Sequence, residues 1–446
     1  MPVDSEFPGP DVDLLVEVGS FEGRRQGLER ALRHAIQTGR LRSGDRLPSS
    51  RTLAQQLGFA RGTVLAAFEQ LTVEGYLRTR ARGRTTVAEI GALSMSADDQ
   101  PVTAGVKFDL RPGEPDTTMF PGAAWLAAMR RVLGEAAGRL GYVHMQGRPE
   151  LRQALAGYLA RARGVRAASA HIVVSSGYSA GLFWICRLLV QRGMRTIAME
   201  DPCFGLHREI VEQAGASVTP IEVDGLGLNV AALRQSEARA VIVTPAHQYP
   251  TGVTLHPTRR AELLAWAREQ DGLVIEDDYD GEFRFDRQPI GSLQGLDPAR
   301  VIYGGTASKS LAPGLRLGWL VLPPELLEDV PRAQWHASAA SALDQLVLAD
   351  LIESYVYDRQ VRRLRLHYRR RRDRLVAALA SAGLEGRIVA SAAGLHLLLA
   401  LPEDGPKEVD VLARAAEIGL AIHGLETHWY HDRPIRRARD RLRPTN

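Results

Sequence analysis

The sequence predicts two domains of different class, a small helical domain that ends in a β-hairpin and a large α/β domain built on a mostly parallel sheet. Between residues 20 and 89, apolar side chains recur at helical spacing and are followed by a hairpin pattern with a glycine at its tip. Beyond residue 107, short apolar runs alternate with longer helical patterns, which is typical of parallel strands covered by helices on both faces.

Length and composition agree with a folded protein of more than one domain. The chain has 446 residues, of which 45% are hydrophobic and 24% charged, and this excludes the disordered, collagen-like and membrane classes. The amino-terminal MPVDSEFPGPDVDLL is acidic and unlike a signal peptide, so we expect a cytoplasmic protein. Cys186 and Cys203 are expected to be buried thiols, and no metal site is predicted.

The amino-terminal domain, residues 20–89, is predicted to contain a helix-turn-helix and a wing. A first helix ends at Gly39, and a second, capped by Ser49 or Ser50, ends at Gly58. A third helix begins near Ala60, and two short helices around a tight glycine turn can place the second one in the major groove of DNA. Residues 74–88 then form a two-stranded wing with a basic tip.

Residues 90–107 are small, polar and weakly patterned, which predicts a linker. The large domain is expected over residues 108–430, with a small lobe from about residue 360. The arginine-rich run 359–374 is predicted to be a solvated helix that joins the two lobes, in preference to a second DNA-binding surface. Strands are predicted at 172–175, 196–199, 218–221, 240–244, 274–277, 301–303 and 317–322.

The stretch 304–319, GGTASKSLAPGLRLGW, contains a lysine, Lys309, among small residues. A poorly solvated lysine amine is nucleophilic enough to form a Schiff base with a carbonyl, the chemistry that holds pyridoxal phosphate. Hydroxyls at Thr306, Ser308 and Ser310, with the cation of Arg316, would suit the phosphate of that cofactor. The alternative is a loop whose lysine is merely solvated.

Two further stretches favour the cofactor interpretation. Residues 273–279, LVIEDDY, predict a buried strand whose carboxyl end carries Asp277, suited to a protonated pyridine nitrogen, and Tyr279, suited to the ring oxygen. Asp278 and Asp280 are interpreted as a helix cap and a solvated turn. Residues 172–178, IVVSSGY, predict a strand, a turn and the amino terminus of a helix, where phosphate binds.

The order of SSGYSAG, EDPCF, HQYPTG, EDDYD and SKSLAPGLRLGW resembles the fold-type I, aspartate aminotransferase-like domain of MocR-type regulators in the GntR family. The resemblance implies Lys309 as the Schiff-base lysine and a homodimer in which Tyr142 reaches the phosphate of the neighbouring subunit. The remaining pyridoxal phosphate ligands that it implies are Ser176, Gly177, Tyr178, Phe204 (stacked on the ring), Tyr249, Asp277, Tyr279, Thr306, Ser308 and Arg316.

The motifs LPSSRTLAQQLGFARGTV and EGYLRTRARGRTTV resemble the GntR-type winged helix, which implies binding to double-stranded operator DNA. The family often has a hydroxyl residue where this chain has Ala60, so a capping contribution of about 1 kcal/mol is expected to be lost. The residues that the resemblance brings to DNA are Ser49, Arg51, Arg61, Thr63, Arg82, Gly83 and Arg84.

The carboxyl end departs from the resemblance. Residues 431–446 are polar and basic, so a disordered tail is expected in place of the strand near which the family carries a carboxylate-binding arginine. Three functions remain open: a regulator that senses pyridoxal phosphate or a small amine or amino-acid effector, an active aminotransferase with an accessory DNA-binding domain, and a regulator whose second domain is only a dimerisation scaffold. We favour the first.

Overall fold

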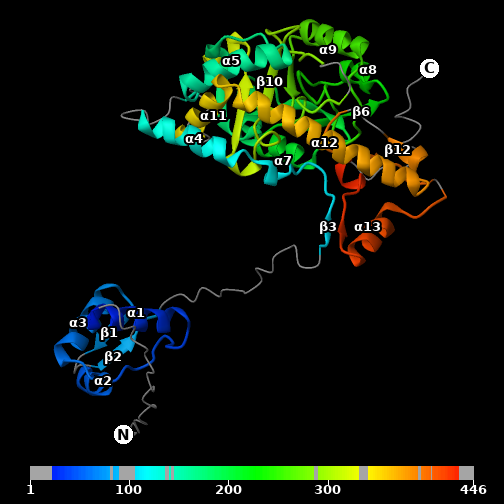
Figure 1. Ribbon diagram of the computed structural model, residues 1–446. Coiled ribbons are helices and arrows are strands. Elements are labelled where there is room, and N and C mark those ends of the chain that lie inside the picture. Colours follow the sequence, from blue (N-terminus) through cyan, green and yellow to red (C-terminus); the bar gives the residue numbers. More distant parts are fainter. Residues whose placement is uncertain are drawn as a thin grey trace, which may run out of the picture. The chain divides into compact units, whose positions relative to one another are not determined.

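The computed structural model describes residues 23–80, 84–89, 106–135, 140–141, 145–285, 290–330, 340–389, 393–402 and 404–430. Its contacts divide the chain into two compact units, Met1–Ala104 and Gly105–Asn446, which are drawn together in Figure 1. Three predicted site residues, Tyr142, Arg82 and Gly83, lie outside the described residues, as does the predicted tail at 431–446.

The first unit has the predicted helix-turn-helix and wing. Three helices, α1 (Arg24–Gln37), α2 (Ser50–Leu57) and α3 (Arg61–Val73), enclose a core that includes the fully buried Leu28, Leu53 and Leu71. Strands β1 (Leu77–Arg80) and β2 (Arg84–Val87) pair antiparallel, with Leu77 opposite Val87. The burial of these two side chains on the helical core fixes which face of the hairpin is inside.

The second unit is built on an eight-stranded sheet, with the order β4-β11-β10-β9-β8-β5-β6-β7. Neighbouring strands are parallel except where β11 and β7 pair, so the prediction of a mostly parallel sheet is confirmed. The strands are β4 (Ile172–Ser176), β5 (Thr196–Asp201), β6 (Ser217–Asp224), β7 (Gly227–Leu228), β8 (Ala240–Val243), β9 (Leu273–Asp277), β10 (Val301–Thr306) and β11 (Leu317–Val321).

Helices cover both faces of this sheet (Figure 1). Successive residues of β10 point to opposite faces of the sheet. Ile302 packs into the core that contains α6 and α7. On the other face, Tyr303 packs into the core that contains α4, α5 and α11, and Val301 packs into the core that contains α8 and α9. The helices are α4 (Gly122–Gly134), α5 (Pro149–Arg163), α6 (Tyr178–Gln191), α7 (Gly205–Gln213), α8 (Val230–Arg234), α9 (Pro257–Glu269), α10 (Pro324–Leu327), α11 (Ala342–Glu353) and α12 (Val356–Ser381).

Helix α12 leads into the small lobe and contains the arginine-rich run. Its buried residues form a narrow stripe of Tyr357, Gln360, Val361 and Leu364, and most of its arginines are exposed, as predicted. The small lobe contains β12 (Ile388–Val389), β13 (Leu398–Leu399), α13 (Glu408–Glu417) and β14 (Leu420–Ala421), and β14 pairs in parallel with β3 (Phe108–Asp109). Among the described residues, no helix is both long and apolar enough to span a membrane.

Candidate functional site

Several predicted ligand residues of the second unit lie at the carboxyl ends of strands in the large sheet. Asp277 is the last residue of β9, Thr306 is the last residue of β10, and Ser176 is the last residue of β4. Register places Asp277 of β9 opposite Gly304 of β10, so the loop that carries Lys309 begins beside the Asp277 carboxylate. Ligands of open α/β sheets bind at this edge of the sheet.

Lys309 is partly buried, and its Nζ donates a hydrogen bond to the carbonyl oxygen of Gly113. Burial lowers the pKa of Lys309, while the nearby carboxylates of Asp280 and Asp277 oppose this effect. The neutral amine is therefore easier to form here than in water, which favours attack on a carbonyl.

Asp277 is 3% exposed, and its Oδ1 makes no hydrogen bond to any described residue. Burial raises the pKa of Asp277 well above its ordinary value, and the carboxylates of Asp278 and Asp280 add to this effect. A buried carboxylate oxygen without a partner is costly unless a ligand supplies a donor. A protonated pyridine nitrogen is such a donor, so Asp277 fits the cofactor that the sequence predicts.

His207 on α7 is a site residue that the sequence analysis missed. Its Nδ1 lies 3.5 Å from Oδ2 of Asp277, and burial, with a smaller effect of Lys309, lowers the pKa of His207 to about 4. It lies three residues after Phe204, so the two share one face of the helical turn, and their rings are 5.1 Å apart. This spacing is the sequence signal that identifies it.

The predicted phosphate turn is tightly built. Gly177 has φ of 82° and precedes the first residue of α6, and a Cβ at Gly177 would lie 3.1 Å from Cζ of Arg316. The side chain of Arg316 makes no hydrogen bond or ion pair to another described residue, so its guanidinium remains available beside the helix amino terminus. Thr306 Oγ1 lies 2.9 Å from Ser308 Oγ and accepts a bond from the Ser308 amide. These groups together fit a phosphate.

One predicted hydroxyl is engaged elsewhere. Ser310 is 1% exposed, and its Oγ lies 2.7 Å from the phenol oxygen of Tyr357, which belongs to α12. This buried contact between the Lys309 loop and α12 engages the Ser310 hydroxyl, which argues against the suggestion that Ser310 helps to bind phosphate. Tyr178 follows Gly177 and has a buried phenol oxygen without a described partner.

Aromatic rings gather around Tyr249. Its ring lies edge-on to Phe204 at 5.7 Å, to Tyr279 at 6.2 Å, and to His396 and His428 at 5.2 Å each. Phe204 is 40% exposed, which leaves a face of its ring available for stacking. Tyr249, Phe204 and Tyr279 were predicted from the sequence. Neither histidine was, because both come from the small-lobe region of the chain.

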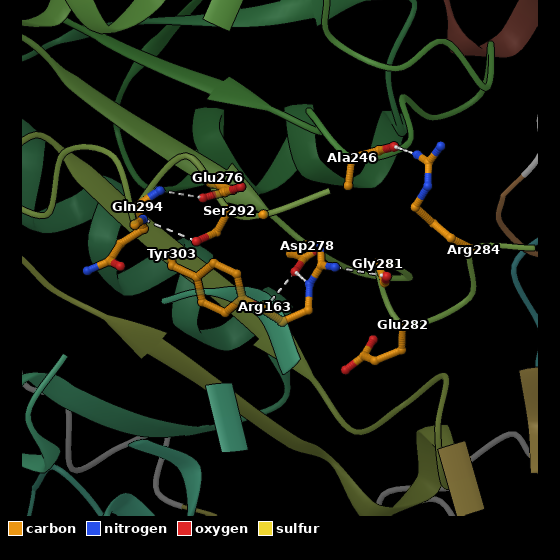
Figure 2. Close-up of polar contacts among 12 residues, drawn as sticks. Arg163, Ala246, Glu276, Asp278, Gly281, Glu282, Arg284, Ser292, Gln294 and Tyr303 are labelled. Carbon is orange, nitrogen blue, oxygen red and sulfur yellow. Dashed lines mark hydrogen bonds and ion pairs between the residues drawn. The ribbon is translucent and has the colours of Figure 1, made fainter. Parts of the chain in front are cut away.

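Asp278 and Asp280 are not the helix cap and solvated turn that the sequence predicted, since they are 4% and 2% exposed. Asp278 accepts two bonds from Arg163 of α5, at 2.6 and 2.9 Å, and one from the phenol of Tyr303 at 2.7 Å (Figure 2). Asp280 Oδ2 lies 2.8 Å from Nδ1 of His247. Both acids are buried because basic partners distant in sequence satisfy them.

Figure 2 also shows the Glu276 carboxylate, which accepts hydrogen bonds from the backbone amides of Leu293 and Gln294 at 2.8 and 3.0 Å. Burial and the neighbouring Asp278 raise the pKa of Glu276 to about 7. The carboxyl end of β9 thus places one acid in the site and two in structural networks.

The segment 425–430 docks beside the site, which the sequence did not predict. The Cys203 amide donates to the His428 carbonyl at 3.0 Å, and the Tyr430 amide donates to Asp201 Oδ1 at 2.9 Å. Arg208 of α7 donates to the carbonyl oxygens of His428 and Trp429. These bonds tie the last described residues to the loop that precedes Phe204.

In the first unit, the exposed side chains of Arg51, Arg61 and Arg84 lie on α2, α3 and the wing. Ser49 caps α2, since its Oγ accepts the Thr52 amide at 3.1 Å. Ala60 occupies the cap position of α3 and makes no side-chain bond there, as expected.

Comparison with known proteins agrees with both halves of the chain. Residues 24–87 match the family of bacterial regulatory proteins, gntR family, and residues 106–417 match aminotransferase class I and II. The uncharacterized HTH-type transcriptional regulator YhdI of Bacillus subtilis is 36% identical, and the match covers 90% of this chain and 87% of the relative. The probable rhizopine catabolism regulatory protein MocR of Rhizobium meliloti is 32% identical, covering 90% and 86%.

The HTH-type pyridoxine biosynthesis transcriptional regulator PdxR of Corynebacterium glutamicum is 33% identical, covering 90% of this chain and 88% of the relative. Among solved structures, the kynurenine aminotransferase of Pyrococcus horikoshii superposes with a TM-score of 0.66 at 26% identity. That superposition covers 73% of this chain and 83% of the aminotransferase.

Proposed function

Because this chain belongs to the MocR-type regulators of the gntR family, in which a helix-turn-helix domain is joined to an aminotransferase-like domain, we propose that it regulates transcription in response to pyridoxal phosphate bound at Lys309. Two of these relatives are HTH-type transcriptional regulators and the third is a probable regulatory protein, which supports a DNA-binding regulator over an aminotransferase with an accessory domain. The sensing step is the part that we propose.

The unpartnered Oδ1 of buried Asp277 is the observation that supports cofactor binding most strongly. When bound, the cofactor would supply an electron-withdrawing ring and an aldehyde that reacts with amines. Lys309 would bind the aldehyde, Asp277 would hold the pyridine nitrogen, and Tyr279 would reach the ring oxygen. Phe204 and Tyr249 would contact the ring, and the phosphate would be held by Ser176, Gly177, Tyr178, Thr306, Ser308 and Arg316.

The sequence makes the test sharp, because it contains only three lysines, Lys107, Lys309 and Lys407. The purified protein is mixed with pyridoxal phosphate, its visible absorption is recorded, and the adduct is reduced with borohydride and mapped by mass spectrometry. We expect a visible band and a label on Lys309, both lost in Lys309→Ala with the far-UV circular dichroism unchanged. Lys407→Ala, which changes an exposed lysine, should keep both; a label that survives in Lys309→Ala refutes the assignment.

We propose that Arg51, Arg61 and Thr63, with Ser49 and the wing residues Arg82, Gly83 and Arg84, contact operator DNA. The exposure of Arg51, Arg61 and Arg84 supports this, since each can reach a phosphate or a base edge. The effector is proposed to be a small amine or amino acid, because such a molecule can exchange with Lys309 at the cofactor aldehyde. Titration of the loaded protein with amines should change the visible band if this is correct.

A homodimer is also proposed. Apolar side chains stand exposed on one side of α4, where Leu126 and Leu133 are each 47% exposed, and this supports a surface that a second copy covers. Sedimentation of the full chain should give twice the 48.9 kDa mass of the monomer. A Leu126→Glu, Leu133→Glu double variant should shift the protein toward the monomer, and an unchanged monomer mass in the unmodified protein would contradict the proposal.

A further inference from the structure

We infer that His247, fixed by Asp280, is a positioning residue for the Tyr279 phenol and acts through it on the ring oxygen of bound pyridoxal phosphate. This inference rests on the proposed function, which brings Tyr279 to that oxygen. The sequence alone does not bring these residues together, because His247 belongs to the turn after β8 whereas Tyr279 and Asp280 follow β9.

Three polar atoms meet at His247. Its Nδ1 lies 2.8 Å from Oδ2 of Asp280 and 3.0 Å from the phenol oxygen of Tyr279. The side chains of His247 and Asp280 are each 1% exposed, so water does not compete for these contacts. Both distances are those of well-formed hydrogen bonds.

The neighbouring carboxylate decides which imidazole nitrogen carries the hydrogen. An ionised Asp280 can only accept, so a hydrogen at Nδ1 satisfies it, whereas a bare Nδ1 would face it with a second lone pair. The same N–H faces the phenol oxygen of Tyr279, and the hydrogen of the phenol stays available for an acceptor. Asp280 is near enough to be one such acceptor, and the ring oxygen of the cofactor would be another.

Tyr279 remains a donor under ordinary conditions. Burial raises the pKa of Tyr279 well above its ordinary value, and the carboxylates of Asp280 and Asp277 add to the effect. A protonated phenol that donates to the cofactor's ring oxygen stabilises the ionised form of that oxygen. The geometry of His247 therefore bears on the acidity of the bound cofactor.

The small lobe holds the imidazole in place. Gly394 has φ of 85°, and a Cβ there would lie 1.8 Å from Cε1 of His247, so only glycine fits against the ring. The ring of His396 lies 4.7 Å away, and Nε2 of His247 is buried without a partner among the described residues. An imidazole that kept its position only for stability would be expected to use both nitrogens.

Two amide substitutions separate the role of Nδ1 from that of the rest of the ring. His247→Asn places an amide nitrogen near the position of Nδ1, whereas His247→Gln places it near Nε2, which has no hydrogen-bond partner among the described residues. The readout is the pH midpoint of the visible band in the full-length protein loaded with pyridoxal phosphate. The other titratable groups around the pair, Asp277, Asp280, Tyr249 and His396, are the same in both variants.

We expect the midpoint to rise by roughly one pH unit in His247→Gln, because a poorly held phenol stabilises the ionised ring oxygen less. His247→Asn should retain most of the original midpoint. In a Tyr279→Phe background, His247→Gln should have no further effect on the midpoint. If His247→Gln does not fold, His247→Leu is interpreted in the same way.

Equal midpoints in the Asn and Gln variants, or a shift that persists in Tyr279→Phe, would overturn the inference. The absence of a visible band in the unmodified protein would overturn the proposed function and this inference with it. A band that is present and does not respond to His247 overturns the inference alone.

Discussion

Replacing Arg163 by methionine tests the buried network under the site. Arg163 is 3% exposed and donates to both oxygens of Asp278 and, at 3.0 Å, to the carbonyl of Gly281 (Figure 2). Methionine keeps much of the side-chain volume but removes the charge. Asp278 then remains buried, and the phenol of Tyr303 is its one remaining side-chain donor among the described residues. Removing one partner of a buried ion pair costs about 3–5 kcal/mol, because the other charge is left uncompensated.

The magnitude can be checked against an exposed pair on the same helix. Arg161 pairs with Asp358 at 2.9 Å, but its side chain is 38% exposed, so Arg161→Met should cost about 1 kcal/mol or less. Free energies of unfolding for both variants are measured by urea denaturation followed by circular dichroism. The difference between the two substitutions isolates the effect of burial on the same chemical change.

A second substitution then identifies the cause of the loss. If the uncompensated charge of Asp278 is responsible, Asp278→Asn should recover a large part of the stability in the Arg163→Met background, although alone it destabilises. A loss in Arg163→Met no larger than that in Arg161→Met, or no recovery in the double variant, would refute this reasoning.

Three further predictions concern DNA binding, pH and turnover. If Arg61 contacts a guanine edge, Arg61→Ala should weaken binding to an operator selected from random DNA by about 1–3 kcal/mol. The affinity is measured by fluorescence anisotropy. Unchanged affinity and unchanged base preference would place the DNA surface elsewhere. Burial raises the pKa of Glu200 to about 7. The contribution of Glu200 to the free energy of unfolding is therefore most favourable below its unfolded pKa and declines as pH rises through 7. Between pH 5 and pH 8, the free energy of unfolding should fall more steeply in the unmodified protein than in Glu200→Gln. Parallel pH profiles for the two proteins would contradict this. Finally, the loaded protein should release little or no keto acid from common amino acids in a single-turnover experiment. Arg414 is the one arginine among the described residues 393–430, and because its side chain is 79% exposed and pairs with Glu417, no arginine fork is left there for a substrate carboxylate. Rapid release of keto acid would favour an active aminotransferase.

Much of the sheet was predictable because its strands are buried on both faces and appear as continuous apolar runs. All seven predicted strands belong to the eight-stranded sheet. The eighth, β7 (Gly227–Leu228), has two residues, too few to show any periodicity. The small-lobe strands are equally short, and one of them, β14, pairs with β3 from a distant part of the chain.

The site was predictable where a residue's chemistry is evident from its immediate neighbours, as for Lys309 among small residues and Asp277 at the end of an apolar strand. It was not predictable where a charge is neutralised from afar. Arg163 precedes Asp278 by 115 positions and His247 precedes Asp280 by 33 positions, so local sequence suggested solvated acids. Only the fold shows which base meets which acid, and therefore which acid remains for a ligand.

The pairing of β3 with β14 has a mechanical consequence. The amides of Lys107 and Leu110 donate to the carbonyl oxygens of Gly419 and Ala421, so the chain joins the small lobe before it reaches the large sheet. A pull on the backbone at Val106 would thus be resisted first by these bonds rather than by the strands that carry Lys309 and Asp277. The same lobe carries Gly394, which lies directly against the His247 imidazole, so the strand pair that holds the incoming chain and the residue that confines this imidazole belong to one lobe.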